Sequence, residues 1–188
     1  MGKLIDIKIY HNSSLNHHID NNRWEGKIIL EEDNWFEGIV KENNDCDSED
    51  NLIMGIYNPN SDIELFLFSP KFDKNVFLFR AKRDTKNYSG ELLMLTNDGE
   101  HYLGTNNIIT SDIEYHTLEN NNVDNNQNIT LAKTELLRNI KTFKEFPVYH
   151  SFYKNTILKK YLSQTIVSRY DKTSKISENE SKVKKLIK

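Results

Sequence analysis

Four basic residues in the middle of the chain form the clearest candidate site for an anion. They are Arg80, Lys82, Arg83 and Lys86. Arg80 and Lys82 share one face if the segment is a strand, because residues i and i+2 point the same way. Guanidinium and ammonium groups on one face could bind a phosphate or a carboxylate. The alternative, which we favour, is that these charges keep the preceding apolar run of residues 76–79 from aggregating.

Residue types that bind metals gather in two polar segments. One segment holds His11, His17, His18 and Asp20, and the other holds Asp45, Asp47, Glu49 and Asp50. Imidazole and carboxylate groups suit zinc, and alternating acids suit calcium. However, adjacent histidines chelate one ion poorly, and the acidic segment lacks the glycine and the bidentate glutamate of a calcium loop. We therefore expect solvated loops without a metal, and we expect no other cofactor.

No nucleophile or acid–base pair is selected by its spacing in the sequence. The single cysteine, Cys46, lies among carboxylates, which disfavour the reactive thiolate. Acids and histidines in or beside the predicted strands are Glu37, Glu64, Glu91, Glu100, His101 and His116. The sequence also lacks a phosphate-binding glycine loop, a nucleophile elbow and the local zinc motifs. We assign no catalytic residue, and this absence favours a protein that is not an enzyme.

Five of the seven glycines lie two residues from an aromatic residue. The pairs are Trp24 with Gly26, Phe36 with Gly38, Tyr57 with Gly55, Tyr88 with Gly90, and Tyr102 with Gly104. In a strand, both members of such a pair face the same side, so the ring can cover the bare backbone of the glycine. Glycine kinks covered by aromatic rings let a twisted sheet curl towards a barrel.

Short segments with strand periodicity recur as far as residue 118. The clearest are 4–10, 24–30, 35–42, 52–57, 63–68, 76–82, 90–96 and 101–104, and either 108–110 or 113–118 closes the sheet. Residues 58–62 and 97–99 carry turn signals. Segments 52–57 and 63–68 are apolar on nearly every position, which predicts burial on both faces. The predicted fold class is mainly β, an antiparallel barrel or strongly curved sheet of about eight strands with a C-terminal α-helical extension.

The end of the chain differs from the rest in charge and periodicity. Residues 1–128 hold 11 Lys and Arg against 23 Asp and Glu, whereas residues 129–188 hold 14 against 5. After a barrel-like domain over residues 1–118, we predict an Asn-rich linker (119–129), a two-helix extension (130–170) and a charged flexible tail (171–188). Thr130 is the expected N-cap, and Pro147 separates the two helices.

The basic extension is expected to dock on the acidic body of its own chain or of a partner subunit. A homo-oligomer built through the C-terminal helices is therefore an alternative function. Nucleic acid is an unfavourable partner, because the acidic body would repel a polyanion.

An antiparallel barrel rich in glycine–aromatic pairs and followed by a C-terminal helix resembles the calycin group, the lipocalins and their relatives. The resemblance covers residues 3–118 as a pattern. Lipocalins carry Gly-x-Trp on their first strand, whereas here Trp24-Glu25-Gly26 has the reverse order and lies on the second strand. No binding residue is therefore transferred. The resemblance implies a barrel interior that holds a small apolar ligand.

Aromatic residues predicted to line the barrel interior define the candidate ligand site. They are Phe36, Tyr57, Phe66, Phe77, Phe79 and Tyr102, with Arg80 and Lys82 as the candidate site for an anionic ligand. The alternative is that these rings fill the core of a small barrel. No apolar run approaches the ~20 residues of a membrane-spanning helix, and the N-terminus has no signal-peptide pattern. We expect a cytoplasmic, non-enzymatic binding module.

Overall fold

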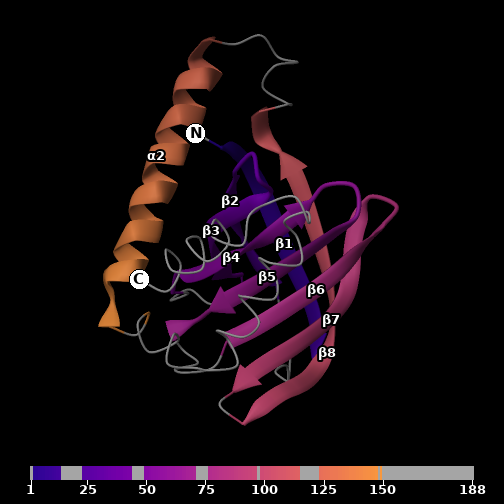
Figure 1. Ribbon diagram of the computed structural model, residues 1–188. Helices are drawn as coiled ribbons and strands as arrows, with labels where there is room; N and C mark the ends of the chain where they lie inside the picture. Colours follow the sequence, from indigo (N-terminus) through magenta and orange to yellow (C-terminus); the bar gives the residue numbers. More distant parts are fainter. Residues whose placement is uncertain are drawn as a thin grey trace, which may run out of the picture.

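The computed structural model describes residues 2–13, 23–43, 49–70, 76–96, 98–114, 123–147 and 149. Eight consecutive strands form a closed antiparallel barrel (Figure 1). The strands are β1 (Lys3–Ser13), β2 (Arg23–Leu30), β3 (Trp35–Glu42), β4 (Asn51–Asn58), β5 (Asp62–Phe68), β6 (Val76–Asp84), β7 (Asn87–Thr96) and β8 (Gly99–Asp112). Each strand pairs with the next, and β1 pairs with β8. The predicted fold class is confirmed, and the sheet is a closed barrel.

The closing strand is longer than the sequence pattern indicated. Residues 101–104 and 108–110 belong to the single strand β8, whose register against β1 runs from Ile5 opposite Asp112 to Ser13 opposite Gly104. The alternative closing segment 113–118 lies mostly outside the described residues. β4 is buried at every position except its last, as its continuous apolar run predicted.

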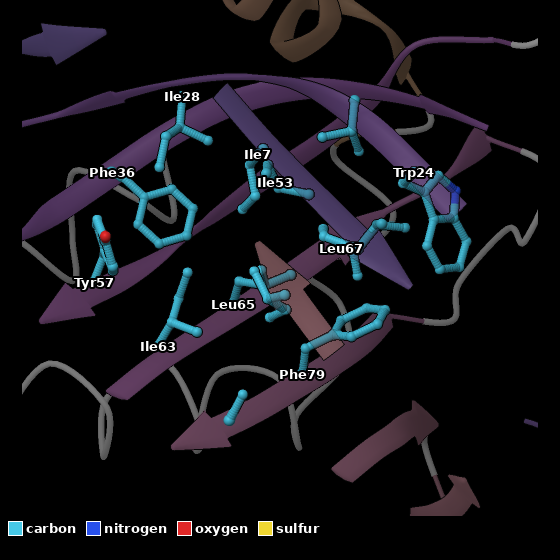
Figure 2. Packing of buried hydrophobic residues seen from close by; sticks show 14 of the residues in the cluster. Ile7, Trp24, Ile28, Phe36, Ile53, Tyr57, Ile63, Leu65, Leu67 and Phe79 are labelled. Atoms are coloured by element: carbon cyan, nitrogen blue, oxygen red, sulfur yellow. The ribbon is translucent and has the colours of Figure 1, made fainter. Parts of the chain in front are cut away.

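Side chains of the strands alternate between the barrel interior and its outer face. The interior cluster includes Ile7, Trp24, Ile28, Phe36, Ile53, Tyr57, Ile63, Leu65, Leu67 and Phe79 (Figure 2). Trp24 and Tyr57 lie at opposite ends of this cluster, with Ile7 and Leu65 between them (Figure 2). The barrel core is therefore a continuous apolar column with an aromatic residue at each end.

Several glycines lie where the neighbouring strand leaves no room for a side chain. A Cβ atom added to Gly90 would lie 1.8 Å from the carbonyl oxygen of Arg80, and one added to Gly26 would lie 1.9 Å from that of Ile39. Such contacts with backbone cannot be relieved by a side-chain movement. The glycines thus allow the strong coiling that closes a small barrel, as the glycine–aromatic pairs predicted.

The outer face of the barrel carries the helix α2 (Val123–Glu145), which runs alongside β2 and β3 (Figure 1). Leu136, Ile140 and Phe143 are buried in an apolar cluster that includes outward residues of the strands. Lys144 Nζ lies 2.6 Å from Glu37 Oε1, and Lys133 forms an ion pair with Glu114. Two basic residues of α2 therefore pair with acids of the same chain.

The helix begins earlier than predicted. It starts at Val123, so the first turns lie within the predicted linker 119–129, and Thr130 is inside the helix rather than at its N-cap. The Thr130 hydroxyl donates a hydrogen bond to the carbonyl of Asn126, which satisfies the hydroxyl without a cap. The helix ends at Glu145, before Pro147, as expected. The second predicted helix and the tail lie outside the described residues.

Among the described helical residues, none forms a segment long and apolar enough to cross a bilayer.

Candidate ligand site

One end of the barrel, here called the tyrosine end, is closed by a turn. The Tyr88 hydroxyl donates to the carbonyl of Pro59 at 2.6 Å, and the Tyr57 hydroxyl shares a 2.9 Å hydrogen bond with Thr110 Oγ1. Arg83 also donates to the carbonyl of Pro59, which holds the β4–β5 turn against this end. Burial, followed by the hydrogen bond with Tyr57, raises the pKa of Tyr88. The hydroxyls of Tyr57 and Tyr88 therefore make hydrogen bonds within the protein at this end of the barrel.

The middle of the barrel is filled by its own side chains. Inward residues that are 0% exposed are Ile9, Ile28, Phe36, Val40, Ile53, Leu65, Leu67, Phe77, Phe79, Leu92 and Ile108. Side chains with no solvent-accessible surface leave no gap for a water-sized probe beside them. The predicted aromatic residues at this depth therefore pack as core.

The opposite end, here called the histidine end, combines polar and aromatic side chains. His11 on β1 and Trp24 on β2 continue the inward rows of these strands, and their rings stack with centroids 4.6 Å apart and planes at 20°. His11 Nδ1 lies 2.9 Å from Ser13 Oγ. Burial lowers the pKa of His11 to about 4. The imidazole is therefore neutral at pH 7, with one nitrogen as donor and the other as acceptor.

Asn106 lies directly across the β1–β8 seam from His11. It occupies the inward row of β8, two residues from Ile108, and is only 5% exposed. Its Nδ2 donates to the carbonyl of Glu91 at 2.7 Å, whereas its Oδ1 is buried without a hydrogen-bond partner. Gly90, opposite Asn106 on β7, leaves room for this side chain. A buried acceptor of this kind is unusual, because buried polar atoms are nearly always satisfied.

Two other buried side-chain oxygens lack a hydrogen-bond partner within the described part of the chain, and both belong to outward rows. Glu25 Oε1 forms ion pairs with Arg23 and Lys8 on the outer surface. Asn107 Oδ1 belongs to the residue that follows Asn106 and therefore faces the other side of the sheet. Among these three atoms, Asn106 Oδ1 is the one on the interior side.

Apolar side chains surround these polar groups. Trp24 meets Phe79 edge-to-face at 5.8 Å. Met94 and Leu103 are partly buried and pack against the interior cluster, and both belong to the parts of β7 and β8 nearest this end. Methionine is a flexible side chain that adapts to a changed neighbour. The histidine end thus combines polar groups with apolar side chains, of which Met94 is flexible.

Four of the predicted lining residues face the interior, and two do not. Phe36, Tyr57, Phe77 and Phe79 belong to the interior cluster. The interior position predicted for Phe66 is wrong, because Phe66 belongs to the outer cluster beneath α2. The interior position predicted for Tyr102 is also wrong, since this ring is 63% exposed. An irregularity between Leu92 and Leu93 shifts the register of β8 by one residue and turns Tyr102 outward.

The cationic pair lies on the outer face of the barrel, away from the interior. Arg80 stands between Glu64 on β5 and Glu91 on β7, with nitrogen–oxygen distances of 3.4 Å and 3.9 Å. Lys82 is two residues further along the same outward row and is exposed. Cross-strand ion pairs of this kind stabilise a sheet surface. The structure does not bring Arg80 or Lys82 together with the inward aromatic residues.

The residues considered above as metal ligands form no metal site within the described part of the chain. The described residues contain no group of three or more His, Cys, Asp or Glu side chains arranged to hold a metal ion. His17, His18, Asp20, Asp45, Cys46 and Asp47 lie outside the described residues.

Sequence reasoning missed the histidine end. The polar composition around His11 predicts a loop, whereas His11 continues the inward row of Ile5, Ile7 and Ile9, and that row is the signal that identifies its position. The inward position of Asn106 can be predicted only from the register of β8, and the irregularity in the β7–β8 pairing makes that register unreadable from the sequence.

Comparisons with models of known protein families, with curated proteins and with solved structures find no match to this chain.

Proposed function

We propose that this protein is a non-enzymatic binding module that takes a small ligand at the histidine end of its barrel. The observation that carries the proposal is the buried Oδ1 of Asn106, which faces the interior without a hydrogen-bond partner. Leaving such an acceptor unpaired costs about 1–3 kcal/mol. A bound molecule that displaced the side chains covering Oδ1 and donated a hydrogen bond would remove this cost.

The architecture supports the same function. Eight consecutive antiparallel strands with a helix packed on the outside agree with the calycin-like pattern of the sequence. In barrels of this size the interior either fills with side chains or holds one small ligand. Here the Pro59 turn is hydrogen-bonded to Tyr88 and Arg83 at the tyrosine end, and we therefore place the ligand at the histidine end, beside the filled middle layer.

The assembly function is less well supported by the described helix. The apolar stripe of α2, formed by Leu136, Ile140 and Phe143, is buried against its own barrel. Lys133 and Lys144 pair with acids of the same chain. These groups are therefore occupied within one molecule, and self-association through α2 would have to use its exposed apolar residues, such as Leu131 and Leu137.

Native mass spectrometry of the purified full chain tests the proposal. We expect a mass excess that is lost on denaturation, absent from Asn106→Leu and retained in the outward control Asn107→Leu. A mass excess that survives equally in both variants would place the ligand elsewhere. A protein that carries no extra mass and also gains none when incubated with a fragment library would contradict the proposal.

A further inference from the structure

The hydrogen-bonding state of Asn106 specifies the polar group of its ligand. The Nδ2 group is already used, since it donates to the carbonyl of Glu91 at 2.7 Å. What remains is Oδ1, a carbonyl oxygen that can only accept. The matching group on a ligand is therefore an O–H or N–H donor.

The charges around the histidine end disfavour an anionic ligand. His11 is neutral at pH 7, because burial lowers its pKa to about 4. Arg80 and Lys82 lie on the outer face, and Arg83 is held at the tyrosine end by Pro59. Among the residues that the structure describes, a carboxylate or phosphate would lose its hydration without gaining a cation.

The surroundings of Asn106 also limit the size and polarity of the ligand. Ile9 and Ile108, each 0% exposed, form the layer next to His11 and Asn106. Trp24 presents an aromatic surface, and Phe79 packs against its edge. A compact ring would have to displace few of these side chains, whereas a long chain would have to displace the filled core.

From these three arguments we infer that the ligand is a small, uncharged, largely apolar molecule that donates one hydrogen bond to Asn106 Oδ1. Phenols, small aromatic alcohols and primary amides have this chemistry. This inference rests on the proposed function and replaces an anionic ligand with a neutral donor.

A set of ring compounds of similar size separates the features of the ligand. Phenol donates a hydrogen bond, anisole only accepts, toluene does neither, benzoate is an anion and benzylamine is a cation.

The full-length Trp35→Phe variant leaves Trp24 as its only tryptophan. The indole N–H resonance of Trp24 then reports binding in two-dimensional 1H–15N spectra. We expect phenol to bind with about millimolar affinity, about fivefold more tightly than anisole or toluene. Benzoate is expected not to bind.

Variants of two adjacent asparagines test whether the preference for phenol comes from Asn106. Asn106→Leu should bind phenol and toluene equally, whereas Asn107→Leu should keep the fivefold preference. Asn106→Ser, which shortens the side chain and removes the carbonyl, serves the same purpose if the leucine variant does not fold. Equal binding of all probes to the parent protein, or tighter binding of benzoate or benzylamine, would overturn the inference while the proposed site remained. Retention of the phenol preference in both Asn106 variants would overturn it as well. If no probe moves the Trp24 resonance, the proposed function itself fails.

Discussion

His11 and Asn106 face each other across the seam between β1 and β8 that closes the barrel. Each lies next to a buried isoleucine in its inward row, Ile9 on β1 and Ile108 on β8, so the seam places two polar side chains at one end of a hydrophobic column. Both carry hydrogen-bonding groups, yet neither bonds to the other. The neutral imidazole is stacked on Trp24, and the amide keeps an unpaired acceptor. This pair gives the barrel a polar end, which the candidate site requires.

Protonation of His11 should make the protein less stable in acid. The pKa is about 4 in the folded state and 6.5 in the unfolded chain, so the unfolded state binds the proton first. This contribution is fully present above pH 6.5 and is lost as the pH falls towards 4. After allowance for solvent screening of a partly buried ring, we expect about 1–2 kcal/mol.

Urea unfolding at several pH values measures this effect. Carboxylates also titrate in this range, so the informative quantity is the difference between the parent protein and His11→Gln. The parent should lose stability relative to the variant as the pH falls from 7 to 4.5. Parallel pH profiles for the two proteins would show that burial does not depress the pKa of His11.

A methyl group at Gly90 should strain the barrel. In Gly90→Ala, the new Cβ would lie 1.8 Å from the carbonyl oxygen of Arg80, and this backbone contact can be relieved only by moving a strand. We expect a loss of about 3 kcal/mol in the free energy of unfolding. Ser89→Ala, at the exposed neighbouring position, should change it by about 0.5 kcal/mol or less. Similar effects of the two substitutions would mean that the strands are not closely coiled at this point.

Two phenylalanines near the end of α2 test how the helix is attached. Phe143 is 3% exposed and packs edge-to-face against Tyr149, whereas Phe146 is 52% exposed. Phe143→Ala should cost about 3–4 kcal/mol, because it opens a cavity between helix and barrel. Phe146→Ala should cost well under about 1 kcal/mol. Thermal unfolding followed by circular dichroism compares them, and the reverse order would contradict the docking of α2.

Removal of one buried hydroxyl should loosen the tyrosine end. The Tyr88 hydroxyl donates to Pro59 at 2.6 Å, and without it the β4–β5 turn keeps only the Arg83 contact to that carbonyl. Tyr88→Phe should therefore lose about 1–2 kcal/mol and speed amide exchange in residues 58–62. Tyr102→Phe, on an exposed ring, serves as the control and should have no measurable effect. Unchanged exchange in the turn would show that the hydroxyl does not hold it.

The barrel could be predicted from the sequence because its local signals agree. Glycine–aromatic pairs and short alternating segments each indicate a curled antiparallel sheet, and Trp24, Phe36, Tyr57 and Tyr88 all face inward. Phe66 shares a row with Asp62 and Glu64, which indicates the outer face, but the continuous apolar end of β5 hides this alternation. The interior position predicted for Tyr102 is wrong because β8 has one extra residue between Tyr102 and Gly104. This residue reverses the face to which the preceding residues of β8 point.

The candidate site could not be found from local patterns. His11 and Asn106 are far apart in the sequence, and only the closing pair of strands brings them together. The polar end of β1 has the composition of a loop, and the strand predicted from the sequence therefore ends at Tyr10. The observed strand continues to Ser13. The outward position of Arg80, by contrast, follows from strand alternation with the inward Phe79. Its ion pairs are made with Glu64 and Glu91 of the two neighbouring strands.

The central claim is that a ligand binds at the histidine end, and mapping of fragment binding by 1H–15N NMR on the full chain tests it most directly. The account predicts that binding fragments shift the side-chain signals of Trp24 and Asn106 together with the backbone amide of His11. The signals of α2 and of the tyrosine end should stay unchanged. Shifts confined to the outer face, around Arg80 or along α2, would contradict the account and place the functional surface outside the barrel.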